Sequence, residues 1–380
     1  MGPLAGMKVV ELAGIGPGPM CAMLLADLGA TVLRVDRKQA VDLGTPRPLQ
    51  YNLLLRNRQS IALDLKQPAA VELVLDLAAG ADGLIEGFRP GVMERLGLGP
   101  DACFARNPRL VYGRMTGWGQ EGPLAAAAGH DLNYIALTGA LHAIGRKAQP
   151  PTPPLNLLGD YAGGSLYLAL GMLAAVIEAR QHGRGQVVDA AIVDGAASLM
   201  TSVFGLYAGG LMSLERGTNS LDSGAYYYDV YECADGQWVS VAPIEGRFHD
   251  ELLRRMEIAP EAIGEQRDRA GWARARAVLA EKFKTKTRAE WCSLLEATDA
   301  CFAPVLTMAE APRTPTSACP SHVYRCGGGR TARACPALQS KRPAHADATG
   351  CARCSAGTGR MVGSGGHHTA RARRRSLGQR

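Results

Sequence analysis

Apolar and polar positions alternate along the first two hundred residues in a way that predicts alternating strands and helices. Short apolar runs at residues 8–12 and 31–36 are typical of buried strands. Between them, residues 20–28 repeat their apolar positions with helical spacing, and Gly29 follows as a helix-ending residue. The order strand, helix, strand predicts a parallel βαβ unit.

The same alternation continues further along the chain. Residues 68–79 form a helical pattern that begins with a proline and ends before a glycine. Residues 82–88 and 109–117 read as further strands, and residues 166–178 as a long buried helix. We therefore expect an α/β fold, with a Rossmann-like parallel sheet covered by helices on both faces.

The pattern changes at Gly224. Residues 225–244 alternate aromatic and polar side chains around Asp235-Gly236, which predicts a β-hairpin. Helical patterns follow at residues 248–256, 272–284 and 288–297. These elements predict a second, smaller α+β domain.

Four segments follow from these patterns. We expect a large α/β domain at residues 1–205, a linker at 206–223, a small domain at 224–310 and an irregular basic tail at 311–380. From about Arg313 the tail has no Ile, Phe or Trp and no periodicity, so it can bury little surface. Its composition resembles out-of-frame translation of GC-rich DNA, which suggests a frameshift near residues 308–316.

Charge and cysteine usage limit the classes of partner. Residues 313–380 hold 13 Lys and Arg against one acid, so the net charge of +7 leaves −5 for the rest and argues against nucleic-acid binding there. The apolar residues 161–177 are short for a membrane span and contain glycines, which favours a buried helix. Scattered single cysteines and an N-terminus without a secretory-signal pattern predict a cytoplasmic protein.

The loop AGIGPGP at residues 13–19 resembles part of a dinucleotide-binding fingerprint. The third position of that fingerprint falls on Pro19, and Pro17 removes another backbone donor where a pyrophosphate needs one. A tight turn between strand and helix is the better interpretation.

Two short segments carry side chains suited to moving protons. His130 and Asp131 stand in GHDLNY, and histidine is the type of side chain that most readily exchanges a proton near neutral pH. Asp160 ends PPLNLLGD, just before the glycine-rich start of the long helix. A structural interpretation stays open for both: Asp160 as a helix cap, and His130 as a hydrogen-bonded core residue.

A series of motifs follows in order along residues 4–307. They are VVELAGIGPGPMCAMLLADLGATVLRVDR, LIEGFRPGVMERLGLGP, RMTGWGQEGP, GHDLNY, PPLNLLGDYAGG, GQVVDAAIVDG, YECADGQWVSVAPIE and TDACFAPVL. In this series the sequence is similar to the alpha-methylacyl-CoA racemase branch of the family III CoA-transferase (CaiB/BaiF-like) superfamily. The resemblance implies interconversion of (R)- and (S)-2-methylacyl-CoA thioesters by a two-base 1,1-proton transfer through an enolate, with no metal or redox cofactor. It also implies an interlocked homodimer and leaves the acyl chain open.

The resemblance also assigns roles to single residues. His130 and Asp160 match the bases that serve opposite faces of the alpha carbon. Glu245 matches an acidic residue that the family brings towards the histidine. Asp131 matches a residue that helps to orient the same histidine. The segment APIEG around Glu245 departs from the family pattern, which puts the shape of that loop in doubt. The residues matched to CoA contacts are Arg37, Leu63, Asp64, Leu65, Lys66, Gly87, Phe88, Arg89, Arg95, Gly129, Leu132, Asn133 and Tyr134.

Two other functions compete with racemisation. In a family III CoA-transferase, the residue matching Asp160 attacks a thioester as a nucleophile. A homologue that binds CoA without catalysis is the other alternative, since the anomalous tail could impair folding or dimerisation. A zinc site at Cys351, Cys354, His367 and His368 has little support, because one C-x-x-C pair in an arginine-rich coil is weak evidence.

Overall fold

A six-stranded parallel sheet organises the first two hundred residues. The computed structural model describes residues 2–39, 44–45, 48–314, 323–326 and 329–332. The strand order is β3-β2-β1-β4-β5-β6, which is the Rossmann order and confirms the predicted fold class. The strands are β1 (Lys8–Leu12), β2 (Thr31–Arg37), β3 (Gln59–Leu63), β4 (Gly83–Glu86), β5 (Val111–Thr116) and β6 (Val187–Ala191).

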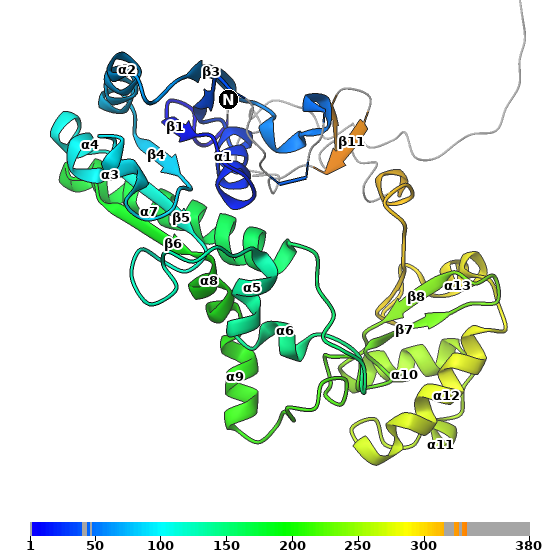
Figure 1. Cartoon of the computed structure of the whole chain (residues 1–380). Helices are drawn as coiled ribbons and strands as arrows, with labels where there is room; N and C mark the ends of the chain where they lie inside the picture. The colour runs from blue at the N-terminus through cyan, green and yellow to red at the C-terminus, as the bar shows by residue number, and fades with distance from the viewer. Residues whose placement is uncertain (1, 40–43, 46–47, 315–322, 327–328, 333–380) are drawn as a thin grey trace, which may run out of the picture. The chain divides into compact units, whose positions relative to one another are not determined.

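Helices cover both faces of this sheet (Figure 1). One apolar core joins the sheet to α1 and α7, and a second joins the other face to α2 and α4. The helix predicted at residues 68–79 is confirmed with the same bounds. The helices of this part are α1 (Pro17–Asp27), α2 (Pro68–Ala79), α3 (Val92–Arg95), α4 (Pro100–Arg106), α5 (Asp131–Leu137), α6 (Ala140–Ala143), α7 (Leu166–His182), α8 (Ile192–Leu199) and α9 (Thr201–Ala208), with short 3₁₀ turns η1 (Leu49–Tyr51) and η2 (Leu53–Leu55).

The predicted start of α1 was wrong by three residues. The helix begins at Pro17 because proline suits a first helical position, where its missing N–H is not needed. The long helix α7 begins at Leu166 as predicted, but it ends at His182 rather than Glu178. A π-helical stretch that was not predicted, η3 (Leu157–Ser165), runs directly into its start. Asp160 is therefore not a cap of the long helix but lies inside η3.

The combined helix Leu157–His182 is long and apolar enough to cross a membrane by length and composition alone, and half of its most apolar window is buried. Leu168, Met172 and Val176 pack into the core beside the sheet. This packing is that of the buried helix expected from the sequence.

A separate apolar core lies within residues 225–300. The hairpin predicted around Asp235-Gly236 is confirmed by β7 (Asp229–Glu232) and β8 (Trp238–Val241), with β9 (Phe302–Pro304) as the third antiparallel strand. The boundaries 1–205, 206–223 and 224–310 stay predictions. The remaining elements are α10 (Gly246–Arg255), α11 (Pro260–Ile263), η4 (Arg269–Gly271), α12 (Trp272–Phe283), α13 (Arg288–Leu295) and η5 (Ala311–Arg313).

The segment expected to be an irregular tail includes a short antiparallel pair, β10 (Val323–Cys326) and β11 (Gly329–Ala332). This hairpin departs from the prediction. Apart from this hairpin and residues 311–314, the tail lies outside the described residues, and so do the cysteines and histidines considered for zinc.

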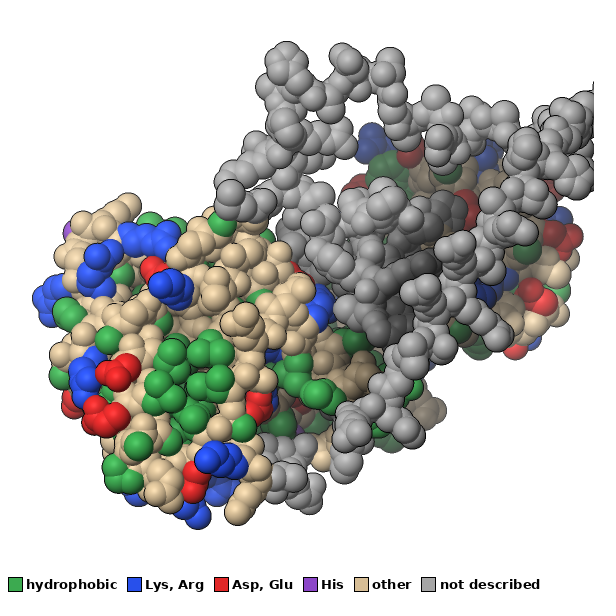
Figure 2. Space-filling view, turned by 90° about the horizontal axis from the view of Figure 1, so that it is seen from above, with side chains coloured by type: hydrophobic (Ala, Val, Ile, Leu, Met, Phe, Trp, Pro, Cys, Tyr) green, Lys and Arg blue, Asp and Glu red, His purple; other side chains and the backbone are tan. Residues whose placement is uncertain are grey.

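The surface carries mixed charge and some large apolar groups. On the face in Figure 2, Lys and Arg side chains lie in small groups near Asp and Glu, with apolar side chains gathered between them. The exposed large apolar residues on α7 and α9 include Leu170, Ile177, Phe204 and Tyr207. Of the cysteines in residues 1–314, Cys21, Cys103 and Cys233 are buried, whereas Cys292 and Cys301 are partly exposed.

Helix α8 crosses η3 at two glycines. A Cβ atom at Gly195 would lie 1.8 Å from the carbonyl oxygen of Gly163, so any larger residue must separate the two helices. At Gly205 in α9, by contrast, nothing lies within 4 Å of the added atom.

We expect Gly195→Ala to destabilise the protein by about 1–3 kcal/mol because the added methyl group overpacks this crossing. Gly205→Ala is the matched control, and the helix propensity of alanine predicts stabilisation of up to about 1 kcal/mol. Equilibrium unfolding in urea measures both changes, and equal stability of the two variants would contradict the close approach.

Candidate active site

A cleft of about 760 Å³ opens at the carboxyl edge of the parallel sheet. It lies where β1 and β4 are neighbours and their following connections diverge, which is the position at which Rossmann-like sheets bind ligands. The cleft is lined by residues 14–19, 86–90, 115–118, 127–130 and 160–161, together with Leu12, Gly44, Thr45, Asn52, Leu54, Leu55, Ile85, Ala125, Tyr134, Asn156 and Ile192.

His130 lies in the cleft at the start of α5. Its backbone N–H donates to Asn133 Oδ1 at 3.1 Å, and its carbonyl oxygen accepts from the Asn133 N–H at 2.8 Å. The Tyr134 hydroxyl donates to the carbonyl oxygen of Gly129, and the Tyr134 ring meets Trp118 edge-on, with centroids 4.7 Å apart. The backbone of the histidine is therefore fixed, while the residue stays exposed to the cleft. The interpretation of His130 as a buried core residue was wrong.

Asp160 lines the same cleft from η3. Asn156 Nδ2 donates to its Oδ2 at 3.2 Å. Its backbone N–H donates to Asp131 Oδ2 at 2.6 Å, and its carbonyl oxygen accepts from Ser165 Oγ at 3.1 Å. π-Helical turns are rare and often occur at functional sites.

Asp131 supports the acid rather than the histidine. Its side chain is buried against the backbone of η3, and its Oδ1 atom has no hydrogen-bond partner among the described residues. A Cβ atom at Gly159 would lie 2.5 Å from Asp131 Oδ2, so this approach requires glycine. The contact observed for Asp131 thus differs from the predicted contact with His130, because α5 places its first residue against η3.

Burial controls the electrostatics of this pair of acids. Desolvation raises the pKa of Asp160 above that of an ordinary aspartate, and the nearby charge of Asp131 raises it further. The hydrogen bond from Asn156 and the charge of His130 oppose that rise. Burial also raises the pKa of Asp131, against hydrogen bonds from the backbone of Gly159 and Asp160. His130 and Asp160 are therefore electrostatically coupled groups in one cleft.

The residues matched to CoA contacts divide into two groups. Gly87, Phe88, Arg89, Gly129 and Tyr134 line the cleft. Arg37 extends this group, since its guanidinium lies 5.3 Å from the centroid of the Phe88 ring.

The pairing of β2 with β3 sets Arg37 opposite Leu63, at the start of the segment Leu63, Asp64, Leu65 and Lys66. The buried Glu86 side chain fixes the loop that follows β4 and contains Phe88. It accepts a hydrogen bond from the Phe88 N–H at 2.7 Å and forms an ion pair with Arg114 at 3.2 Å. Burial raises the pKa of Glu86 to about 6.

Other predicted site residues lie elsewhere. Arg95 ends α3, Leu132 is exposed on α5, and Asn133 acts through its hydrogen bond to the His130 backbone. Glu245 precedes α10, and it is not among the cleft-lining residues of the described chain.

Sequence reasoning missed three residues of the site. Asn156 contacts the carboxylate directly, but its place in a proline-rich loop gave no signal of that contact. Gly16 has φ of +65°, and a Cβ atom there would lie 3.1 Å from Asp160 Oδ2. Trp118 lines the cleft, and its buried Nε1 has no hydrogen-bond partner within the described segments. The sequence AGIGPGP shows a glycine at position 16, but only the three-dimensional structure shows that this glycine lies beside Asp160.

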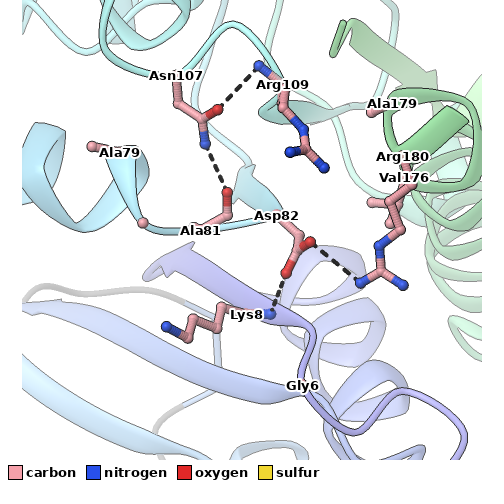
Figure 3. A pocket seen from close by; sticks show the side chains of 11 residues that line it. Gly6, Lys8, Ala79, Ala81, Asp82, Asn107, Arg109, Val176, Ala179 and Arg180 are labelled. Carbon is pink, nitrogen blue, oxygen red and sulfur yellow. Dashed lines mark hydrogen bonds and ion pairs between the residues drawn. The ribbon is translucent and has the colours of Figure 1, made fainter. Parts of the chain in front are cut away.

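A second hollow, of about 330 Å³, lies where β1 and β4 begin (Figure 3). Asp82 accepts there from the Lys8 N–H at 2.8 Å and pairs with Arg180 at 3.3 Å. Asn107 donates to the carbonyl oxygen of Ala81 at 2.8 Å. Its lining residues include a single carboxylate and no imidazole, so the carboxyl-edge cleft is the better candidate for proton chemistry.

Comparisons with known proteins agree on one family. Residues 4–348 match the family model of CoA-transferase family III. The chain is 45% identical over 308 residues to alpha-methylacyl-CoA racemase of Mus musculus, covering 81% of this chain and 79% of that protein. It is 32% identical over 320 residues to the beta subunit of succinyl-CoA--L-malate CoA-transferase of Chloroflexus aurantiacus, covering 79% and 76%. A CAIB/BAIF family protein from Brucella suis superposes with a TM-score of 0.74 at 26% identity, covering 87% and 91%.

The contacts of Asp160 predict its titration. We expect its carboxyl pKa to lie above the ordinary aspartate value, and Asn156→Ala to raise it further by removing a hydrogen bond that favours the charged form. Carbon-13 NMR of labelled protein, with Asp160→Asn to assign the signal, measures both. Gln149→Ala, in the same loop, should leave the titration unchanged. A lower pKa in Asn156→Ala would contradict the assignment.

Proposed function

This chain belongs to CoA-transferase family III, and from that membership and its cleft we propose that it is an isomerase that interconverts (R)- and (S)-2-methylacyl-CoA thioesters. The observation that carries the proposal is the cleft shared by His130 and Asp160, which come from different elements. The name and 45% identity of the mouse relative support the same substrate class.

Inversion at carbon explains the need for two groups. One base removes the alpha proton from one face of the thioester, which leaves an enolate, and the conjugate acid of the other delivers a proton to the opposite face. The bound enantiomer decides which residue is base. Each proton transfer of this kind contributes roughly 10²–10⁴-fold. Because the pKa of Asp160 is raised, a larger fraction of that carboxyl carries a proton at neutral pH than in an ordinary aspartate.

The proposal places CoA along the loops that follow β2, β3 and β4. Arg37, Lys66 and Arg89 offer positive charge for its phosphates, and Phe88 an aromatic surface for adenine. The reaction moves protons and no electrons, so the proposal includes no redox cofactor or metal. The acyl chain stays open.

We further propose a homodimer in the cytoplasm, with Glu245 of the partner subunit completing the site and with no nucleic-acid or membrane partner. The large exposed apolar side chains on α7 and α9 support association with another protein surface. The free cysteines of residues 1–314 support a reducing compartment.

Isotope exchange tests the reaction. In heavy water, wild-type protein should incorporate deuterium at C2 of (S)-2-methylacyl-CoA while optical purity is lost. We expect His130→Ala and Asp160→Ala each to reduce racemisation by about 10²–10⁴-fold, because each removes one of the two proton carriers. NMR of C2 and chiral analysis measure the two processes. Undiminished racemisation in either variant would disprove its role.

Hydroxylamine distinguishes the alternative, CoA transfer, which is favoured by the transferase name of the Chloroflexus relative. A transferase that uses Asp160 as a nucleophile forms an acyl anhydride, which hydroxylamine intercepts. We expect a racemase to keep its activity and to gain no hydroxamate at Asp160 when treated with substrate and hydroxylamine. Peptide mass spectrometry reports the modification, and a hydroxamate at residue 160 would favour transfer.

A further inference from the structure

A carboxylate with no exposed side-chain surface lies between two arginines beneath the cleft. Glu11 on β1 pairs through Oε1 with Arg34 Nη1 at 2.7 Å, and through Oε2 with Arg58 Nη1. Arg34 lies directly opposite Glu11 on β2, and its Nε atom also pairs with Asp36 at 2.9 Å. The three strands β1, β2 and β3 meet at this cluster, because Arg58 immediately precedes β3.

This cluster is costly to bury. The Arg58 side chain is 1% exposed, yet its Nε and Nη2 atoms have no hydrogen-bond partner in the part of the chain that the structure describes. Desolvation accordingly lowers its pKa, against the favourable charge of Glu11. Buried ion pairs of this kind seldom stabilise a fold relative to apolar side chains, so a role in fixing geometry is a better explanation for them.

The cluster is connected to the loop behind the catalytic acid. Glu11 lies one residue before the end of β1, and residues 13–17 follow as the loop. Arg34 Nη2 reaches the carbonyl oxygen of Gly14 at 3.5 Å, and the Ala13 N–H donates to the carbonyl oxygen of Val35 at 3.0 Å. The exit of the chain from β1 is therefore held from the side of β2.

The far end of the same loop lies against Asp160. A Cβ atom at Gly16 would lie 3.1 Å from Asp160 Oδ2, which is a tight contact. Ser165 Oγ donates to the carbonyl oxygen of Pro17 at 2.9 Å and to that of Asp160 at 3.1 Å. One hydroxyl thus joins the loop to η3. Movement of residues 14–17 would change the space around the Asp160 carboxylate.

We propose that Glu11, held by Arg34 and Arg58, is a positioning residue for Asp160 and acts through the loop of residues 13–17. The inference rests on the proposed racemisation and adds that its two proton transfers depend on Glu11 to different extents. His130 is fixed by contacts with Gly129, Asn133 and Tyr134, none of which belongs to the Glu11 cluster. A disturbance at Glu11 should therefore slow proton transfer by Asp160 and leave transfer by His130 nearly unchanged.

The experiment measures deuterium exchange at C2 separately for each enantiomer in heavy water, with full-length protein. His130→Ala and Asp160→Ala first assign which enantiomer each residue deprotonates. We expect Glu11→Gln to slow exchange from the Asp160 enantiomer by about 10-fold to 100-fold, as misplacement of a reacting group does, and the other by less than about 3-fold. Equal losses for both enantiomers, or no loss, would overturn the proposal.

Two further variants exclude a general loss of structure. Arg34→Lys keeps a cation beside Glu11 but removes the Nη2 atom that reaches the carbonyl oxygen of Gly14. We expect it to slow exchange from the Asp160 enantiomer more than from the other. It takes the place of Glu11→Gln if that variant does not fold. Asp82→Asn removes a carboxylate and its ion pair at the opposite edge of the sheet, and it should affect neither enantiomer. Circular dichroism and thermal unfolding check the fold of each variant.

A readout without substrate separates this inference from the proposed function. If wild-type protein exchanges neither enantiomer, racemisation is wrong, and the Asp160 carboxyl titration then decides the inference alone. We expect Glu11→Gln to shift that titration and Asp82→Asn to leave it unchanged. An Asp160 titration that is identical in all three proteins would overturn the positioning role.

Discussion

The site depends on the divergence of the connections that follow β1 and β4. These strands are neighbours in the sheet, but their paired residues, such as Val9 and Gly83, lie 74 positions apart in sequence, because each half of the domain winds away from the other. Their carboxyl ends therefore leave a crevice that no crossover helix fills. Residues of the Gly14–Pro17 loop, the Gly87–Arg89 loop and η3 all meet there. The strand order thus creates the crevice, and the side chains that line the crevice determine its chemistry.

Buried carboxylates hold that crevice in shape. Asp131 accepts from the backbone of η3, Glu86 accepts from the Phe88 N–H, and Glu11 binds two arginines beneath the β1 exit. Each acid gives up hydration and gains a fixed contact with a loop or turn that lines the cleft. Three carboxylates around one site thus carry a desolvation cost, which is typical of a functional region rather than of a core selected only for stability.

Local signals explain which elements could be predicted from the sequence. Helix α2 has a proline at its start and a glycine after its end, so its bounds at residues 68–79 could be predicted from the local sequence alone. The strand β3 was missed because Gln59–Leu63 is a short edge strand whose residues stay partly or fully exposed. His130 and Asp160 were predicted from their residue types and the family resemblance. The π-helical setting of Asp160 could not be, since it depends on Asp131, twenty-nine positions away, and on the crossing with α8.

The widened turn of η3 makes the site sensitive to residue count. A π-helical turn holds an additional residue relative to an α-helical one. Loss of one residue from Leu157–Ser165 would let the stretch relax to α-helix, and each residue of an α-helix advances the side-chain direction by about 100°. An acid displaced by that angle would face protein rather than the cleft. Single-residue deletions should therefore be far less tolerated in this turn than conservative substitutions, although the turn forms part of an otherwise ordinary core helix.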